Sequence, residues 1–237
     1  MSTNKKSYPT TMGWRELVNI YREFGDNAQQ CVDFVIDNIQ PKADGYRMGF
    51  TQSPLRIFNK MVKFKPDGVY ILYKDGHNEK FDGHNGKAGV RAIGLSHDTH
   101  CFGIALKDAG KYKLVRDFNK CPSQSSTYID SECMALMDWD YKLKTKLIKD
   151  VGTDIPLKKD EYIPTLPMLV LMGAYKYEIN KALIYVGGEA IKEDRYWSST
   201  EGSAYNAWYV VMNNGSVGNG YFKYYMSLVR PTSAFSL

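Results

Sequence analysis

The 237-residue sequence lacks the features that would assign it to a familiar enzyme class. It contains no Gly-x-Ser-x-Gly nucleophile motif, no phosphate-binding loop and no dinucleotide-binding fingerprint. No group of acids, histidines and cysteines singles out a nucleophile with its base. No apolar run reaches the length that a membrane span requires, and no apolar segment typical of a secretory signal follows Met1. We therefore expect no enzyme, no cofactor and no membrane insertion.

Cysteine, histidine and charge are also uninformative as site signals. The four cysteines are Cys31, Cys101, Cys121 and Cys133. Their spacing fits neither a zinc ribbon nor a redox pair, which predicts free and mostly buried thiols. His97 and His100 lie between two strand-like runs, where residues three apart face opposite sides, so we expect an exposed loop and no metal site. The net charge of +5 comes from scattered lysines, which argues against a nucleic-acid partner.

Hydrophobic periodicity divides the chain near residue 66. Residues 14–24 and 31–39 carry apolar side chains at helical spacing, which predicts a small helical N-terminal region over residues 1–66 for attachment or oligomerisation. A second domain follows over residues 67–237. Its strands are expected at 69–73, 90–95, 102–106, 207–212 and 226–235, and its helices at 130–150 and 165–186.

Turn signals lie between these elements. Gly187-Gly188 should end the helix at 165–186, and Gly173 is a point where that helix could divide. Asp75-Gly76-His77 and Asp82-Gly83-His84 predict turns and not calcium loops, because a dense carboxylate series is missing. Asn213-Asn214-Gly215 predicts a hairpin turn. Together these signals indicate an α+β domain.

The stretch from Gly202 to Leu228 has an unusual composition. It contains a single charged residue, Lys223, and five tyrosines among Gly, Ser and Asn residues. Antibody contact loops have a similar mixture, in which aromatic residues anchor the ligand and small polar residues adapt to it. A tyrosine-rich β domain without a ligand would have the same composition, so both interpretations remain open at this point.

Several short motifs carry a family resemblance. They are 196–201 (Tyr-Trp-Ser-Ser-Thr-Glu), 206–210 (Asn-Ala-Trp-Tyr-Val), 213–215, 229–231 (Val-Arg-Pro), 234–235, and the upstream segments 103–109 and 163–166. The chain over roughly residues 68–237 thereby resembles the variable proteins of diversity-generating retroelements, most closely those of gut Bacteroides and their phages. The resemblance implies a C-type-lectin-like fold, akin to that of formylglycine-generating enzymes, with a variable region at about 196–231.

The resemblance also implies how the sequence varies. A reverse transcriptase miscopies adenines, so Asn codons of the AAC or AAT type become others that cannot encode Trp, Met, Lys, Gln or Glu. Trp208, Met212, Lys223 and Met226 should then be fixed. Buried scaffold positions are expected at Trp197, Trp208, Val210, Val229 and Phe235. The variable, ligand-binding positions are expected to project from one face: Gly202, Tyr205, Asn206, Tyr209, Val211, Asn213, Asn214, Ser216, Gly218, Asn219, Gly220, Tyr221, Phe222, Tyr224, Tyr225, Ser227 and Leu228.

The resemblance implies a binding protein and not a catalyst. The enzyme-like relatives use cysteines late in the domain, and this chain has none after Cys133. The variable region has no carboxylate cluster, so binding should not need calcium. The expected partner is a protein or glycan on a cell surface, and a homotrimer would multiply weak contacts. The absence of an export signal after Met1 favours display on a phage virion, at a tail tip or fibre, over a bacterial surface adhesin whose leader was removed.

Overall fold

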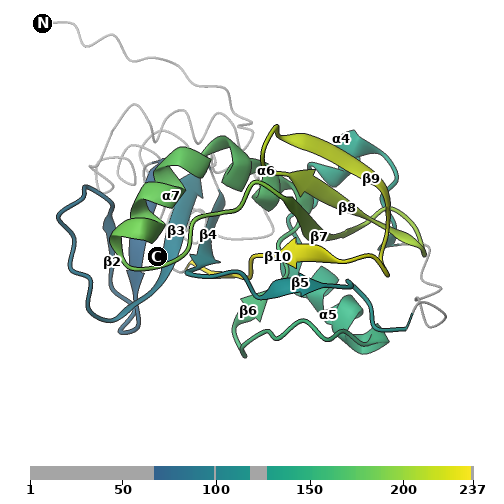
Figure 1. Ribbon diagram of the computed structural model, residues 1–237, viewed down its shortest axis with the longest axis horizontal. Coiled ribbons are helices and arrows are strands. Elements are labelled where there is room, and N and C mark those ends of the chain that lie inside the picture. Colours follow the sequence, from purple (N-terminus) through teal and green to yellow (C-terminus); the bar gives the residue numbers. More distant parts are fainter. Residues whose placement is uncertain (1–66, 99, 118–126, 236–237) are drawn as a thin grey trace, which may run out of the picture. The chain divides into compact units, whose positions relative to one another are not determined.

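The computed structural model describes residues 67–98, 100–117 and 127–235, which form an α+β domain built on two sheets (Figure 1). The helices expected within residues 1–66, together with Cys31 and Cys121, lie outside the described residues. Within the described part of the chain, no helix is both long and apolar enough to cross a bilayer.

Six antiparallel strands form the first sheet, in the order β2-β1-β3-β4-β11-β6. Its central strands are rich in β-branched and aromatic residues, and both of their faces are buried. Gly94 and Gly103 are cross-strand partners, and a Cβ atom at Gly94 would lie only 2.8 Å from the Leu72 side chain and 2.9 Å from that of Phe235. These glycines therefore let side chains pack flat on the sheet. The strands are β1 (Gly68–Tyr73), β2 (Asn78–Lys80), β3 (Val90–His97), β4 (His100–Ala105), β6 (Glu161–Tyr162) and β11 (Thr232–Ala234).

Five strands form the second sheet, in the order β5-β10-β7-β8-β9. The pair β10 and β7 is parallel, and the other pairs are antiparallel. Strand β9 is at the edge of this sheet, and the turn at Asn213-Asn214-Gly215 connects it to β8, with Gly215 at φ 73° as the hairpin signal predicts. The strands are β5 (Gly110–Tyr112), β7 (Arg195–Glu201), β8 (Asn206–Val211), β9 (Ser216–Phe222) and β10 (Ser227–Val229).

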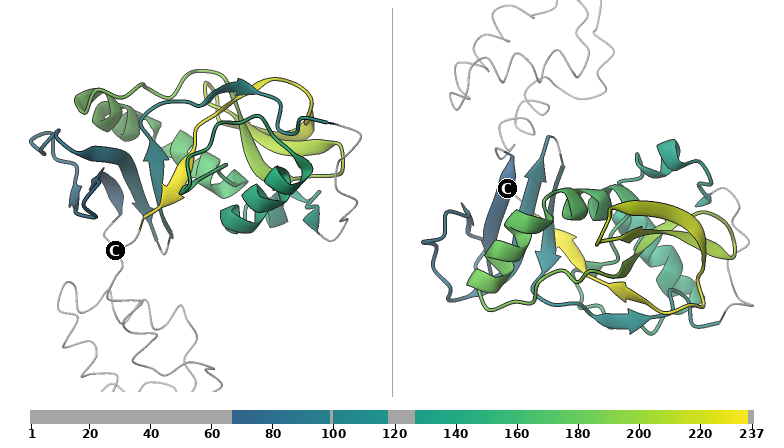
Figure 2. Two further views of the ribbon diagram at one scale, coloured as in Figure 1. Left: turned by 90° about the horizontal axis from the view of Figure 1, so that it is seen from below. Right: turned by 45° about the horizontal axis from the view of Figure 1, so that its top comes forward.

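Two consecutive helices connect the sheets. Helix α6 (Leu166–Ala174) packs on β7 and β8, and helix α7 (Lys176–Tyr185) packs on β1 and β3 (Figures 1 and 2). The chain bends between them at Tyr175, close to the expected break at Gly173, and it leaves α7 through Gly187 at φ 79°. One hydrophobic core lies between these helices and both sheets, and the buried Trp208, Met172, Ile93 and Leu183 contribute to it.

The single helix expected over residues 130–150 is instead two helices, α4 (Glu132–Ala135) and α5 (Tyr141–Val151). Between them the Asp138 carboxylate turns inward and accepts a hydrogen bond of 2.9 Å from the Thr200 hydroxyl. The Asp140 carboxylate then caps α5 by accepting the Leu143 N–H. Two aspartates with structural roles therefore interrupt a pattern that looks continuously helical. Three residues of the expected apolar side are exposed, namely Met134, Met137 and Leu143.

The last strand expected, over residues 226–235, is also divided. Its first part, β10, lies inside the five-stranded sheet, and its second part, β11, lies inside the six-stranded sheet. Arg230 and Pro231 make the crossing between them. The physical reason is that two buried sheets share this segment, which a pattern of alternating residues does not reveal.

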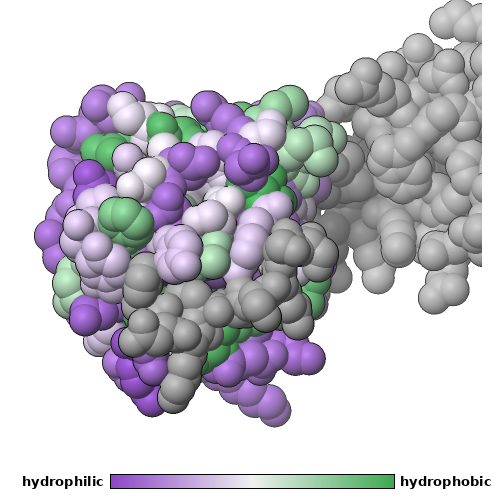
Figure 3. Space-filling model, turned by 90° about the vertical axis from the view of Figure 1, so that its right-hand side faces the viewer, coloured by the Kyte–Doolittle hydropathy of each residue, from purple (hydrophilic) through white to green (hydrophobic). Residues whose placement is uncertain are grey.

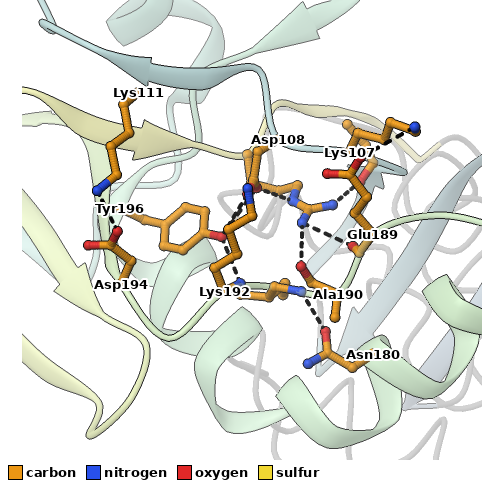
Figure 4. Close-up of polar contacts among 12 residues, drawn as sticks. Lys107, Asp108, Lys111, Asn180, Glu189, Ala190, Lys192, Asp194 and Tyr196 are labelled. Atoms are coloured by element: carbon orange, nitrogen blue, oxygen red, sulfur yellow. Dashed lines mark hydrogen bonds and ion pairs between the residues drawn. The ribbon is translucent and has the colours of Figure 1, made fainter.

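The crossing is fixed by a buried ionic network around Arg230 and Asp108 (Figure 4). The Arg230 Nε lies 2.7 Å from the Asp108 carboxylate, and both side chains are almost fully buried. The guanidinium also donates to the carbonyls of Ala105, Glu189 and Ala190 at 3.0–3.1 Å. Ala105 ends β4, Asp108 precedes β5, and Glu189 and Ala190 follow α7, so one arginine joins three segments beside the two sheets.

Tyr196 completes this network from β7. Its hydroxyl lies 3.1 Å from the Asp108 carboxylate and accepts the backbone N–H of Lys192 at 2.9 Å. Burial and the nearby Asp108 charge raise the pKa of Tyr196 well above its usual range, so the phenol stays protonated and donates to Asp108. Asp108 therefore has the buried Arg230, the neutral Tyr196 hydroxyl and, at 3.6 Å, the Lys192 ammonium as partners.

The two Asp-Gly-His segments form turns, as expected. The N–H of His77 donates to the Asp75 carboxylate at 2.9 Å, and the N–H of His84 donates to that of Asp82 at 2.7 Å. Gly76 and Gly83 follow these aspartates with φ of 93° and 84°.

Candidate ligand-binding face

Aromatic side chains and one arginine gather where β7, β8, β9 and the β9–β10 loop meet. We call this set the tyrosine face, and it consists of Arg195, Tyr209, Tyr221, Phe222, Tyr224 and Tyr225. Tyr209 and Tyr221 lie on the same side of the sheet as Trp197 and Ala207, away from α6. Tyr225 and Phe222 are 40% and 37% exposed, whereas the other members are partly buried.

The rings of the tyrosine face contact one another in a continuous series. Tyr221 has its ring centroid 5.3 Å from that of Trp197, 5.7 Å from that of Tyr209 and 4.8 Å from that of Tyr225. Tyr224 lies 4.6 Å from Tyr225 and stacks on Phe222 at 5.3 Å. The fully buried Trp197 donates its indole N–H to the Tyr112 carbonyl, so the series is attached to the core at this end.

Tyrosine hydroxyls supply the polar part of this surface. A side-chain hydrogen bond with Tyr225 raises the pKa of the Tyr224 phenol, so the Tyr224 hydroxyl remains neutral near pH 7. Seen from the side of the molecule at the right of Figure 1, pale residues of intermediate hydropathy lie beside hydrophilic ones, without one continuous hydrophobic patch (Figure 3). Rings with flat apolar faces and polar tips suit the recognition of ligands that are neither wholly apolar nor highly charged.

Arg195 lies against the rings at the start of β7. Its guanidinium carbon is 3.8 Å from the Tyr221 ring centroid and 4.8 Å from that of Tyr209. A cation over an aromatic face is attracted by the ring quadrupole. Arg195 precedes the quoted motifs and the sequence analysis missed it, although its position two residues before Trp197 places it on the same side of β7.

Lys223 anchors the loop that carries Phe222, Tyr224 and Tyr225. Its side chain is fully buried, and its Nζ donates to the Glu201 carboxylate at 2.5 Å and to the Ala204 carbonyl at 3.0 Å. Its backbone N–H donates to the Tyr205 carbonyl, and its own carbonyl accepts the N–H of Leu114. The single charged residue between Gly202 and Leu228 therefore points inward while its aromatic neighbours reach the surface.

The scaffold positions expected from the sequence are buried. Trp197, Trp208, Val210, Val229 and Phe235 all have less than a tenth of their surface exposed. Three of the four residues expected to be fixed, Trp208, Met212 and Lys223, are buried as well. Met226, the fourth, is 53% exposed, so burial gives no reason for it to be fixed.

The expected variable positions do not share one face. Those on the surface or partly exposed are Tyr205, Asn206, Tyr209, Val211, Asn213, Asn214, Ser216, Gly218, Asn219, Gly220, Tyr221, Phe222, Tyr224 and Tyr225. Asn213, Asn214 and Ser216 lie at the turn of the β8–β9 hairpin, whereas Asn206 pairs with Phe222 at its other end. Asn219 is directed away from the tyrosine face, with its amide 3.3 Å from the Asp130 carbonyl.

Three expected variable positions are buried, which corrects the sequence-based assignment. Ser227 and Leu228 belong to β10, which is enclosed between β5 and β7, and they are only 2% and 3% exposed. Gly202 is buried too, and a Cβ there would lie 3.2 Å from Asn219. The codon argument concerns only which residues can be encoded, so it cannot distinguish these positions from exposed ones.

A close approach between β8 and β9 shapes the tyrosine face. A Cβ atom on Gly218 would lie 2.6 Å from the Tyr209 hydroxyl and 2.8 Å from the ring carbon bearing it. Gly218 therefore lets the Tyr209 ring lie across β9 toward Tyr221 and Arg195. A side chain at this position would have to displace the ring, so variation at residue 218 would reshape the face indirectly.

We expect Gly218→Ala to lower the free energy of unfolding by about 1–3 kcal/mol, because the Tyr209 ring must leave its position. Gly220→Ala on the same strand is the matched control, since no atom lies within 4 Å of its added Cβ. Urea unfolding followed by tryptophan fluorescence measures both. Equal stability of the two variants would contradict the close approach.

The two histidines considered as metal ligands, His97 and His100, have local structural roles. His97 and His100 are cross-strand partners in the β3–β4 hairpin, so the chain reverses between them and they are not three apart on one strand. His97 Nδ1 lies 2.9 Å from the Tyr175 hydroxyl, and His100 stacks on Trp139 with 3.6 Å between ring centroids. Among the described residues, no group of three or more His, Cys, Asp or Glu side chains could hold a metal ion.

Neither of the two described cysteines, Cys101 and Cys133, forms a disulfide, as expected. Cys101 is partly buried, but Cys133 is exposed, which corrects the expectation of mostly buried thiols. Cys133 lies on the short helix α4.

Comparison with known proteins gives a partial similarity to solved structures. No protein-family model matches the chain, and no curated protein sequence matches it. Among solved structures, a fimbrial protein from Bacteroides ovatus is similar with a TM-score of 0.43 at 16% sequence identity, over 71% of this chain and 48% of that one. The chain thus spans about half the length of that structure.

Proposed function

We propose that residues 67–237 form a ligand-binding domain in which a retroelement diversifies the surface around the tyrosine face. The scaffold would be C-type-lectin-like, and binding, not catalysis, would be its purpose. The observation that carries the proposal is how the residues between Gly202 and Leu228 divide between the core and the surface. Three of the four residues that adenine mutagenesis could not produce, Trp208, Met212 and Lys223, are buried, whereas Tyr205, Phe222 and Tyr225 are exposed beside them.

This arrangement satisfies the physical requirement for a diversified surface. A scaffold tolerates many side chains only where they contribute little to its stability. The hairpin of β8 and β9 lies at the edge of its sheet, and its stability depends on Trp208, Val210 and Met212 on the side of the core. Substitutions on the opposite side would therefore change contacts with a ligand more than they change folding.

Display at a surface follows from a binding role. We propose a phage tail tip or fibre as the site of display, with a bacterial surface adhesin as the alternative, and a protein or glycan on a cell as the partner. Several weakly binding copies, as in a homotrimer, would gain affinity through avidity. A leader encoded upstream of the gene would favour the bacterial surface.

Deep sequencing of this gene across a population of its natural source tests the proposal. We expect substitutions to concentrate at the exposed and partly exposed positions of codons 202–225, with Trp208, Met212 and Lys223 unchanged. Gly202, Ser227 and Leu228 should vary little, because they are buried. Substitutions spread evenly over the gene, with no template copy nearby, would contradict retroelement diversification.

A further inference from the structure

Arg195 is a cation that forms no ion pair with a side chain of the described residues. Its Nε atom is buried without a hydrogen-bond partner, and its guanidinium forms no ion pair with any described residue. The adjacent acid, Asp194, is already engaged, because it forms an ion pair of 2.7 Å with Lys111 and accepts the backbone N–H of Arg195. The hydrogen bonds from the Lys111 side chain and the Arg195 backbone lower the pKa of Asp194, and the charges of Lys111 and Arg195 add to this effect.

The contacts of Arg195 leave its donors available. Tyr209 and Tyr221 interact with the guanidinium through their rings, and such contacts use no N–H group. A guanidinium has five N–H donors in a planar fork that matches a carboxylate. Arg195 is also only partly buried, so an anion can approach it from solvent.

The surroundings of Arg195 favour one kind of anion. Between Gly202 and Leu228 the only other cation is Lys223, which is buried and paired with Glu201. The nearby groups are instead phenol rings, with Tyr209 and Tyr221 against the cation and Tyr225 beside Tyr221. One cation among aromatic rings and hydroxyls suits a polyhydroxylated ligand with one carboxylate, whereas a polyanion would require several cations.

We propose that Arg195, Tyr209 and Tyr221 form a carboxylate-binding subsite for a sugar acid, such as a sialic or uronic acid, at the end of a glycan. This inference rests on the proposed function and names the ligand class for the same face. Arg195 lies outside the positions expected to vary. The subsite would therefore be common to all diversified forms of the protein, and the variable residues would select the remainder of the glycan.

Titration calorimetry with the full chain tests this subsite, using 3′-sialyllactose and methyl β-D-glucuronide, which carry one carboxylate each, as probes. Each is compared with its methyl ester, and hexaglutamate serves as an acidic peptide. We expect at least one acid to bind at least tenfold more tightly than its ester. Arg195→Lys keeps the charge but loses the fork, so it should weaken that binding at least tenfold, and Arg195→Gln should weaken it further. Arg116→Gln is the control, because it removes an exposed arginine and the same charge.

The outcomes separate the subsite from the proposed function. Equal binding of acids and esters, no binding of either acid, or unchanged affinity in a folded Arg195→Gln protein would each overturn the subsite. Preference for hexaglutamate would also overturn it and would indicate an acidic peptide. If Tyr225→Ala weakens binding of lactose or of an ester while Arg195→Gln does not, the tyrosine face binds ligands without the subsite. Thermal melting of each variant shows whether a loss reflects misfolding.

Discussion

Replacing Arg230 with methionine is expected to lower the free energy of unfolding by about 3–5 kcal/mol. The substitution keeps much of the side-chain volume but removes the buried cation 2.7 Å from the Asp108 carboxylate, which then has only the Tyr196 hydroxyl and the more distant, partly exposed Lys192 ammonium at 3.6 Å. Three backbone carbonyls, those of Ala105, Glu189 and Ala190, lose their donor at the same time. Buried acceptors that lose a partner bear the full cost of desolvation, so the effect should be among the largest for any single substitution in the domain.

A surface pair of the same chemistry provides the control. Arg116 and Asp154 form an ion pair of 2.7 Å, with both side chains about two-thirds exposed. Arg116→Met should therefore cost at most about 1 kcal/mol. Urea unfolding, followed by tryptophan fluorescence, compares the two variants. If Arg230→Met unfolds at the same urea concentration as Arg116→Met, the network around Arg230 does not join the sheets as described.

Replacing Lys223 with methionine is expected to cost a similar amount, about 3–5 kcal/mol, and to loosen the tyrosine face. Glu201 is 1% exposed, and without Lys223 its carboxylate would be buried with no cation beside it. The Ala204 carbonyl would also lose its donor. Because Lys223 holds the loop from inside, the residues on either side of it, Phe222 and Tyr224, should lose their fixed positions.

Two measurements separate the local and global effects of Lys223→Met. Adding Glu201→Gln to Lys223→Met removes the unpaired buried charge and should restore part of the stability. The control variant, Lys107→Met, breaks an exposed ion pair with Glu189 and should change the stability little. Hydrogen exchange should accelerate at two backbone amides. The Lys223 N–H donates to the Tyr205 carbonyl, and the Leu114 N–H donates to the Lys223 carbonyl. Unchanged exchange at these amides would show that the side chain does not anchor the loop.

The sequence predicts most elements of the domain because local signals and burial agree there. Strand β1 is a run of β-branched and aromatic residues, and α7 ends just before Gly187, which has a positive φ. Prediction failed where long-range contacts decide the structure. The interruption between α4 and α5 depends on Thr200, which is 62 residues from its partner Asp138, and the division of residues 226–235 depends on two sheets that compete for one segment.

The candidate site was predictable in composition but not in geometry. Its tyrosines stand out between Gly202 and Leu228, and Lys223 is conspicuous as the only charge there. The sequence does not show that Ser227 and Leu228 are enclosed, because they are small or apolar residues beside exposed ones. Arg195 could not be assigned either, since its role depends on rings contributed by two other strands.

The crossing at Arg230 also affects the order in which a newly made chain can fold. Strands β10 and β11 are interior strands of different sheets, between β5 and β7 and between β4 and β6 respectively. While residues 227–234 are still inside the ribosome, β5 and β6 each lack the neighbour to which they pair. Both sheets must therefore wait for the same eight residues. The β8–β9 hairpin, which carries Tyr209 and Tyr221, precedes these residues in the chain, so its tyrosines are made before the strands that close the fold supporting them.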